Sequence, residues 1–150
     1  MRLIRLAAAA AVTMFVTASP SLAEKTKPEE LLKMRQGVFQ AVKANFVPLL
    51  AIAKGSAKPD DQTAQYGENL AALAKIVPMG FGPGTEDLPK SDTKPAAFTS
   101  PDFAKAAKMF QAESVKLAEA AKSGDVEAIK AQVGAVGKAC KACHDDFRKE

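Results

Sequence analysis

Apolar residues recur every three or four positions over four stretches of this chain, which is the period of an α-helix with one buried face. The first stretch opens at Thr26 with a T-x-x-E capping box and a proline in its first turn, and it ends at Lys54 and Gly55. Pro48 lies inside it and is expected to kink the last turn. Its apolar positions are Leu31, Leu32, Val38, Phe39, Val42, Phe46, Leu49 and Leu50.

The other three stretches have the same period. The second begins near residues 59–61 and stops at Pro78, the third is capped by Ser100, and the fourth is capped by Asp125 after a turn at residues 123–125. The repeating positions are Tyr66, Leu70, Leu73 and Val77, then Phe103, Ala107, Phe110, Ser114, Leu117 and Ala121, then Ile129, Val133, Val136, Cys140, Cys143 and Phe147.

Residues 78–99 show no helical period and are rich in glycine and proline. No stretch of the chain alternates with the period of two that marks a strand. The run G-F-G-P-G-T at residues 80–85 has no lysine after its last glycine, so it is not a phosphate-binding loop. We therefore predict an all-α fold, an antiparallel four-helix bundle with one long crossover loop between helices 2 and 3.

The sequence C-K-A-C-H at residues 140–144 is the attachment signal of a c-type haem. On a helix, Cys140 and Cys143 lie about one turn apart on one face, so each thiol can form a thioether to the same porphyrin. His144 follows directly and would supply the axial nitrogen to the iron. Both cysteines fall on the apolar stripe of the fourth helix. The haem is therefore expected on the inside of the bundle.

Other interpretations of this motif fit less well. A structural zinc site needs four ligands, and the chain has only these two cysteines and one histidine. A thioredoxin-like redox pair would follow a strand, whereas this pair lies in a helical pattern. A disulfide between the two cysteines would leave the adjacent histidine unexplained.

Residues 1–23 have the composition of a secretory signal peptide. Arg2 and Arg5 precede an apolar run over residues 6–16, and small residues lead to the expected cleavage site after Ala23. The run is shorter than the ~20 residues that span a membrane. We expect residues 24–150 to form one exported domain with no membrane segment. Since c-type haem is attached outside the cytoplasm, the bacterial periplasm is the expected compartment.

The charge of the chain argues against nucleic acid as a partner. The full sequence has a net charge of +4, and removing the two arginines of residues 1–23 leaves 19 basic against 17 acidic residues. The lysines are scattered singly, without basic blocks or interleaved aromatic residues. A solvated surface accounts for them.

The chain resembles the cytochrome c′ family, the class II c-type cytochromes. The resemblance covers the whole exported domain and rests on four sequence elements: K-P-E at residues 27–29, R-Q at 35–36, F-G-P-G-T at 81–85, and C-K-A-C-H-D with F-R at 140–148. A haem motif at the C-terminal end of a helical bundle is the most specific of these. The resemblance implies the same four-helix bundle fold.

The resemblance also implies roles for single residues. Cys140 and Cys143 match the thioether anchors, and His144 matches the proximal ligand. Arg35 and Gln36 match a pair beside the haem propionates, where a guanidinium suits a carboxylate.

Three further positions are candidate haem contacts. Phe39 matches the position that faces the vacant side of the iron. Arg148 matches a basic residue beside the proximal histidine, and Phe81 belongs to the crossover motif. Each also has an ordinary structural interpretation: core packing for the two phenylalanines, and the helix dipole for Arg148.

The sixth position of the iron has no obvious protein ligand in this sequence. There is no second histidine, and the methionines after residue 23 are Met34, Met79 and Met109, for which we expect core-filling roles. We predict five-coordinate, high-spin iron with an apolar vacant side, which disfavours O₂ and tolerates NO and CO.

The favoured function is therefore that of a periplasmic haem c protein that binds NO or CO. We expect it to serve in NO binding or detoxification, with redox activity. The alternative is a low-spin electron carrier with histidine and methionine ligands. An enzyme such as a peroxidase is disfavoured, because the distal His/Arg pair is missing. The expected partners are small gases, an unidentified periplasmic redox protein and a second copy of the chain, since apolar residues surround more than one side of the first helix.

Overall fold

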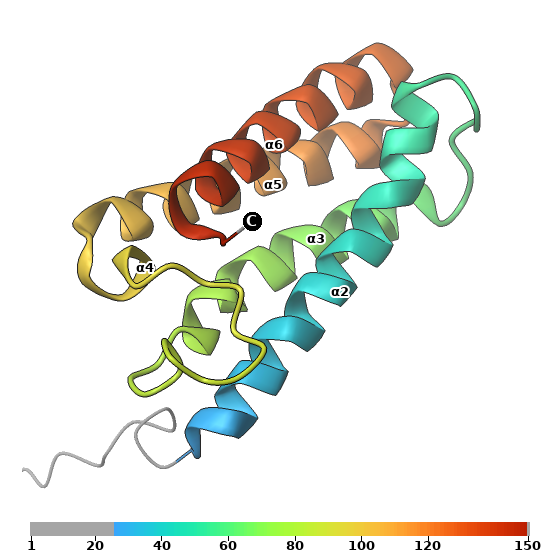
Figure 1. Ribbon diagram of the computed structural model, residues 1–150. Coiled ribbons are helices and arrows are strands. Elements are labelled where there is room, and N and C mark those ends of the chain that lie inside the picture. The colour runs from blue at the N-terminus through green and yellow to red at the C-terminus, as the bar shows by residue number, and fades with distance from the viewer. Residues whose placement is uncertain (1–25, 150) are drawn as a thin grey trace, which may run out of the picture.

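The computed structural model describes residues 26–149, and the expected signal peptide at residues 1–23 lies outside them. Four long helices form an antiparallel bundle (Figure 1). They are α2 (Pro28–Ala53), α3 (Thr63–Ile76), α5 (Pro101–Ser123) and α6 (Val126–Phe147). The crossover between α3 and α5 contains a short 3₁₀ helix, η1 (Val77–Gly80), and a single turn, α4 (Ala96–Thr99). The predicted all-α bundle with its long crossover is confirmed.

Two of the predicted helix starts are confirmed by their caps. The Ser100 side chain accepts a hydrogen bond from the backbone N–H of Asp102, and the Asp125 side chain accepts from Glu127 and Ala128. These bonds satisfy N–H groups that the first turn of a helix leaves without partners. Pro101 additionally favours the start of α5, because its φ is fixed near the helical value.

The starts of the first two helices differ from the prediction. Lys27, rather than Thr26, is the N-cap of α2 and makes no side-chain cap bond, because its ammonium group has no acceptor. Pro28 instead favours the helix start by its fixed φ. The carboxylate of Asp60 accepts hydrogen bonds from the Gln62 N–H and the Thr63 hydroxyl. Residues 60–62 therefore form a turn, and α3 begins only at Thr63.

Pro48 lies inside α2, and the helix continues past it to Ala53. The prediction of a loop without regular structure over residues 78–99 is wrong for α4, which spans only Ala96–Thr99. One turn is too short to show a hydrophobic period. Its backbone hydrogen bonds run from the Ala97, Phe98 and Ser100 N–H groups to the carbonyls of Lys94, Pro95 and Ala96.

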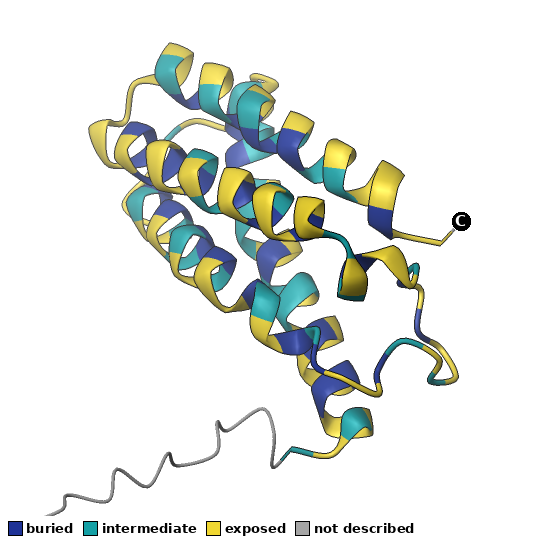
Figure 2. Cartoon of the chain, turned by 90° about the vertical axis from the view of Figure 1, so that its left-hand side faces the viewer, coloured by how far each residue is buried: buried dark blue, intermediate teal, exposed yellow. Residues whose placement is uncertain are grey.

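The core lies along the axis of the bundle, and Figure 2 shows the buried segments turned inward on each long helix. Its largest fully buried side chains include Leu49, Leu70, Leu117, Ile129 and Val136, contributed by all four long helices. These are positions that the apolar period predicted. The expected core-filling role of the methionines is wrong, since Met34, Met79 and Met109 are 38%, 49% and 45% exposed.

Helices α3 and α5 cross at very close range. A Cβ placed on Gly67 of α3 would lie 2.8 Å from the Cα of Ala118 and 2.9 Å from the Cβ of Ala121. Only glycine at this position allows α3 and α5 to pack so closely. None of the described helices is long and apolar enough to span a membrane.

Candidate functional site

A cavity of about 880 Å³ lies between α2 and α6, with the crossover residues Phe81, Lys90, Asp92 and Thr93 in its wall. Its walls come from α2, α3, α5, α6 and the crossover. All eight residues that the sequence singled out line this one cavity: Arg35, Gln36, Phe39, Phe81, Cys140, Cys143, His144 and Arg148. Residues more than 100 positions apart in the sequence therefore meet at one site.

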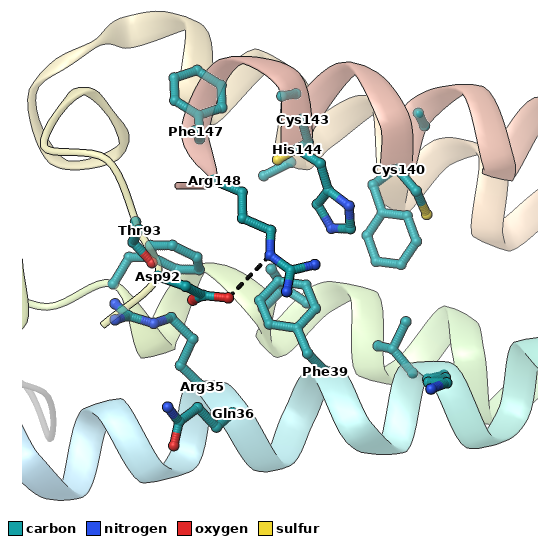
Figure 3. Close-up of a pocket in the computed structure, with 18 of the residues that line it drawn as sticks. Arg35, Gln36, Phe39, Asp92, Thr93, Cys140, Cys143, His144, Phe147 and Arg148 are labelled. Atoms are coloured by element: carbon teal, nitrogen blue, oxygen red, sulfur yellow. Dashed lines mark hydrogen bonds and ion pairs between the residues drawn. The ribbon is translucent and has the colours of Figure 1, made fainter. Parts of the chain in front are cut away.

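Cys140 and Cys143 lie on the face of α6 that borders the cavity (Figure 3). Both are free thiols and partly buried. Burial raises the pKa of the Cys140 thiol, and burial together with the nearby Cys140 and Asp146 raises the pKa of Cys143. Both shifts favour the protonated thiol, and both side chains border the cavity.

His144 extends from α6 into the space between α6 and α2 (Figure 3). Partial burial lowers the pKa of its imidazole, and the positive charge of Arg148 lowers it further, against opposing contributions from Asp92 and Asp145. A neutral imidazole offers a nitrogen lone pair, which is the form that binds a metal.

Aromatic rings form much of the opposite wall. Phe39 rises from α2 toward His144 (Figure 3), and its ring packs edge to face on Phe81 at 6.4 Å. Phe81 also lies 4.5 Å from the ring of Phe103. Val42 lines the same cavity. Phe39 and Val42 thus give the α2 side an apolar surface, and Gln40 and Lys43 of the same helix also line the cavity. That Phe39 faces the vacant side of an iron stays a prediction.

Arg35 is buried, with only 3% of its surface exposed. Its guanidinium donates hydrogen bonds to the Thr85 hydroxyl at 3.0 Å, the Ser91 hydroxyl at 3.1 Å and the Gly80 carbonyl at 3.3 Å. It also lies 4.8 Å from the centre of the Phe81 ring. Burial lowers its pKa, while the acidic side chains nearby raise it. These bonds fasten the crossover to α2.

Gln36 and Arg148 lie at the edge of the cavity and are exposed. The Gln36 side-chain amide donates to the Lys90 carbonyl at 3.3 Å. The Nε of Arg148 donates to the Asp92 carboxylate at 3.0 Å, across the gap between α6 and the crossover (Figure 3). The role of Arg35 and Gln36 beside the haem propionates stays a prediction.

Asp92 and Thr93 are cavity residues that the sequence did not indicate. Thr93 is buried and forms an isolated antiparallel bridge with Arg148. Both residues lie in a loop without a hydrophobic period, so no sequence pattern predicts that they reach the cavity. The only available signal was that a crossover of this length is usually packed or functional.

The residues of this cavity fit a haem. Its volume is within the range of cofactor sites, its walls are rich in aromatic rings, and its two thiols and one imidazole lie together on α6. Within residues 26–149, no group of three or more histidine, cysteine or acidic side chains could hold a metal ion by itself. A single protein nitrogen suffices when a porphyrin provides the other four.

A sequence model of the family described as Cytochrome C′ matches residues 30–148. The chain belongs to this family. A cytochrome c′ of Rubrivivax gelatinosus is 38% identical over 128 residues, which cover 83% of this chain and 98% of the relative. One from Alcaligenes xylosoxydans xylosoxydans is 35% identical, with 83% and 97% covered.

Solved structures agree with this assignment. A nitric oxide complex of a variant cytochrome c prime from Alcaligenes xylosoxidans superposes with a TM-score of 0.76 at 35% identity, covering 83% of this chain and 98% of that chain. Cytochrome c′ from Thermochromatium tepidum gives 0.78 at 31% identity, with the same coverage. The cytochrome c′ family implies haem c as the cofactor.

Proposed function

We propose that this protein is a periplasmic cytochrome c′ that carries one haem c and binds nitric oxide and carbon monoxide. Cys140 and Cys143 would hold the haem through thioethers, and His144 would be its axial ligand. When bound, the haem supplies an iron atom that binds small diatomic gases. The solved complex of a similar cytochrome c prime with nitric oxide supports this proposal.

The observation that carries the proposal is the contrast between the two sides of the cavity. The α6 side has an imidazole in its neutral form beside two thiols, whereas Phe39 on α2 faces it with an apolar ring. No methionine lines the cavity in the described part of the chain, and His144 is the only histidine in the sequence. These facts support a vacant sixth position and disfavour the low-spin histidine and methionine alternative.

We expect Phe39 to influence which gases bind, through its apolar character and its bulk. An apolar ring such as Phe39 offers no hydrogen bond to bound O₂, which is stabilised by a distal donor. NO and CO carry less charge separation when bound, so the lack of a hydrogen-bond donor costs them less binding free energy. The bulk of Phe39 would restrict even these. A binding role, with redox activity, is therefore proposed in preference to an enzymatic one.

Visible spectroscopy of the purified full chain tests this proposal. The oxidised and reduced proteins should give high-spin spectra, and the reduced spectrum should change on adding NO or CO. A low-spin reduced spectrum that neither gas alters would overturn it and favour the electron-carrier alternative. Cell fractionation of the producing bacterium should place the protein in the periplasm, with a mass that lacks residues 1–23.

A second copy of the chain is the proposed protein partner. Helices α2 and α3 carry the exposed apolar residues Val47, at 48%, and Ile76, at 40%, together with Met34. Burying them between two copies would remove apolar surface from water. For the redox activity we propose a periplasmic electron-transfer protein as the partner.

A further inference from the structure

Residues 90–94 of the crossover, which we term the tether, join α2 to the end of α6 across the mouth of the cavity. On the α2 side, the Ser91 hydroxyl accepts a hydrogen bond from Arg35 at 3.1 Å. The Lys90 carbonyl accepts another from Gln36 at 3.3 Å. Ser91 is 8% exposed, so the first of these contacts is shielded from water.

On the α6 side, the tether is held by the backbone. The Lys94 N–H donates to the Phe147 carbonyl at 2.8 Å, and the Lys149 N–H donates to the Asp92 carbonyl at 2.7 Å. These two bonds flank the bridge between Thr93 and Arg148. The backbone of Asp92 is thus fixed relative to the end of α6 before any side-chain contact is considered.

The side chain of Asp92 then reaches the side chain of Arg148. Their Oδ2 and Nε atoms are 3.0 Å apart, and the two side chains are 56% and 57% exposed. An exposed ion pair usually contributes little, because ordering two long side chains costs entropy. Here the bridge and the backbone bonds already order one end of each side chain, which reduces that cost.

Arg148 is also tied to His144. Its backbone N–H donates to the His144 carbonyl at 3.0 Å, in the last turn of α6. Figure 3 shows the Arg148 side chain crossing from the end of α6 toward Asp92, on the same side of the helix as the His144 ring. The Arg148 guanidinium is therefore near enough to His144 for its charge to act on the imidazole, and its carboxylate partner is on the tether.

We propose that Asp92 is a positioning residue that holds the guanidinium of Arg148 beside His144 and so sets the surroundings of the iron–histidine bond. The inference rests on the proposed function for the bond itself, and on the contacts above for the position of Arg148. Without the Asp92 carboxylate, the exposed and flexible side chain of Arg148 would adopt other rotamers that are solvated by water. The cation then leaves the space next to the imidazole.

The test compares Asp92→Asn with Asp87→Asn in the purified full chain. Asp87 is an exposed acid of the same crossover, so the control removes the same charge from the same loop. Nitrogen-15 NMR of the reduced, CO-bound protein reports the Arg148 Nε–H directly. In the wild-type protein we expect the chemical shift of this resonance to differ from that of free arginine. In Asp92→Asn it should move to the free-arginine value, and in Asp87→Asn it should keep the wild-type value. Asp92→Glu, which keeps the charge, should restore part of the displacement.

Resonance Raman of the reduced protein reports the iron–histidine stretching band. Asp92→Asn and Arg148→Gln should shift this band by the same amount, and the double variant should shift it no further, because both changes remove one interaction. Additive shifts, or a band in Asp92→Asn at the wild-type position, overturn the inference. Absence of the band in the wild-type protein overturns the proposed function instead. The NMR comparison tests separately whether Asp92 holds Arg148.

Discussion

The guanidinium of Arg35 on α2 donates a 3.0 Å hydrogen bond to the hydroxyl of Thr85, fifty residues later in the crossover. Thr85 is completely buried and in turn donates to the Gly82 carbonyl at 2.9 Å. A buried arginine with several neutral acceptors fixes the course of a loop that has no regular structure of its own. The geometry of the cavity mouth depends on this contact.

Replacing Arg35 with lysine should therefore destabilise the protein. A lysine ammonium cannot reproduce the planar fork that reaches Thr85 and Ser91 together, so buried hydroxyls lose a partner. We expect a loss of about 2–4 kcal/mol in the free energy of unfolding, measured by urea denaturation. Gln36→Ala removes one exposed hydrogen bond and is the control, with an expected loss of about 0.5 kcal/mol or less. Equal losses in the two variants would contradict the structural role of Arg35.

Truncating Phe39 to alanine should open the side of the cavity that faces His144. We expect CO association with the reduced protein to accelerate by about tenfold or more, equivalent to removing ~1.4 kcal/mol of steric barrier. The half-buried ring also packs on Phe81, so the free energy of unfolding should fall by about 2 kcal/mol. Flash photolysis gives the rate.

The neighbour Val38 provides the control for that experiment. It is partly buried on the same helix but does not line the cavity, so Val38→Ala should leave the CO rate near that of the parent. If Phe39→Ala folds, holds haem and binds CO at the parent rate, another side chain guards the iron. Val42, which lines the cavity, is then the next candidate.

Two glycine substitutions test the close crossing of α3 and α5. Gly67→Ala places a methyl 2.8 Å from the backbone of Ala118, and forcing the helices apart should cost about 1–3 kcal/mol. Gly134→Ala on α6 meets nothing within 4 Å and should stabilise the protein by about 0.5–1 kcal/mol, because alanine loses less backbone entropy in a helix. Thermal denaturation of both variants decides, and a stabilising Gly67→Ala would contradict the crossing.

The proposed dimer predicts a concentration-dependent sedimentation coefficient at tens of micromolar. Val47→Glu places a charge on the exposed apolar side of α2 and should shift the protein to monomer. Val115→Glu, at a residue of α5 with similar exposure, should leave the dimer intact. Monomeric sedimentation of the wild-type protein would count against the dimer.

The helices and the residues on α6 could be predicted because their signals are local. Cys140, Cys143 and His144 form one short motif, and the period of Ile129, Val133 and Val136 identifies the buried face. Each signal lies within a few turns of one helix, where side-chain direction follows from sequence spacing. The resemblance to the family added Phe39 and Arg148, which do line the same cavity.

The contacts of the crossover could not be predicted in the same way. The partners of Arg35 lie 45 to 56 residues away in a loop without a period, and nothing local to Arg35 indicates burial. In the sequence, Asp92 is not distinguished from other acidic loop residues. Only the structure shows that the bridge between Thr93 and Arg148 brings it opposite Arg148. Such pairings are set by tertiary packing.

The axial role of His144 is tested by His144→Ala. Loss of the imidazole should change the reduced visible spectrum and abolish the iron–histidine band, while the thioethers keep the haem attached. The His144 side chain borders the cavity and is not part of the packed core, so the fold should survive the change, as circular dichroism would show. An unaltered reduced spectrum would be incompatible with ligation by His144.

The central claim is a single haem held covalently by Cys140 and Cys143, and intact mass spectrometry of the exported protein tests it most directly. After expression with a cytochrome c maturation system, residues 24–150 should carry the added mass of one haem that acid-acetone extraction does not remove. The Cys140→Ala/Cys143→Ala variant should lose it. A wild-type protein that is exported and folded but has the mass of the polypeptide alone would contradict the account.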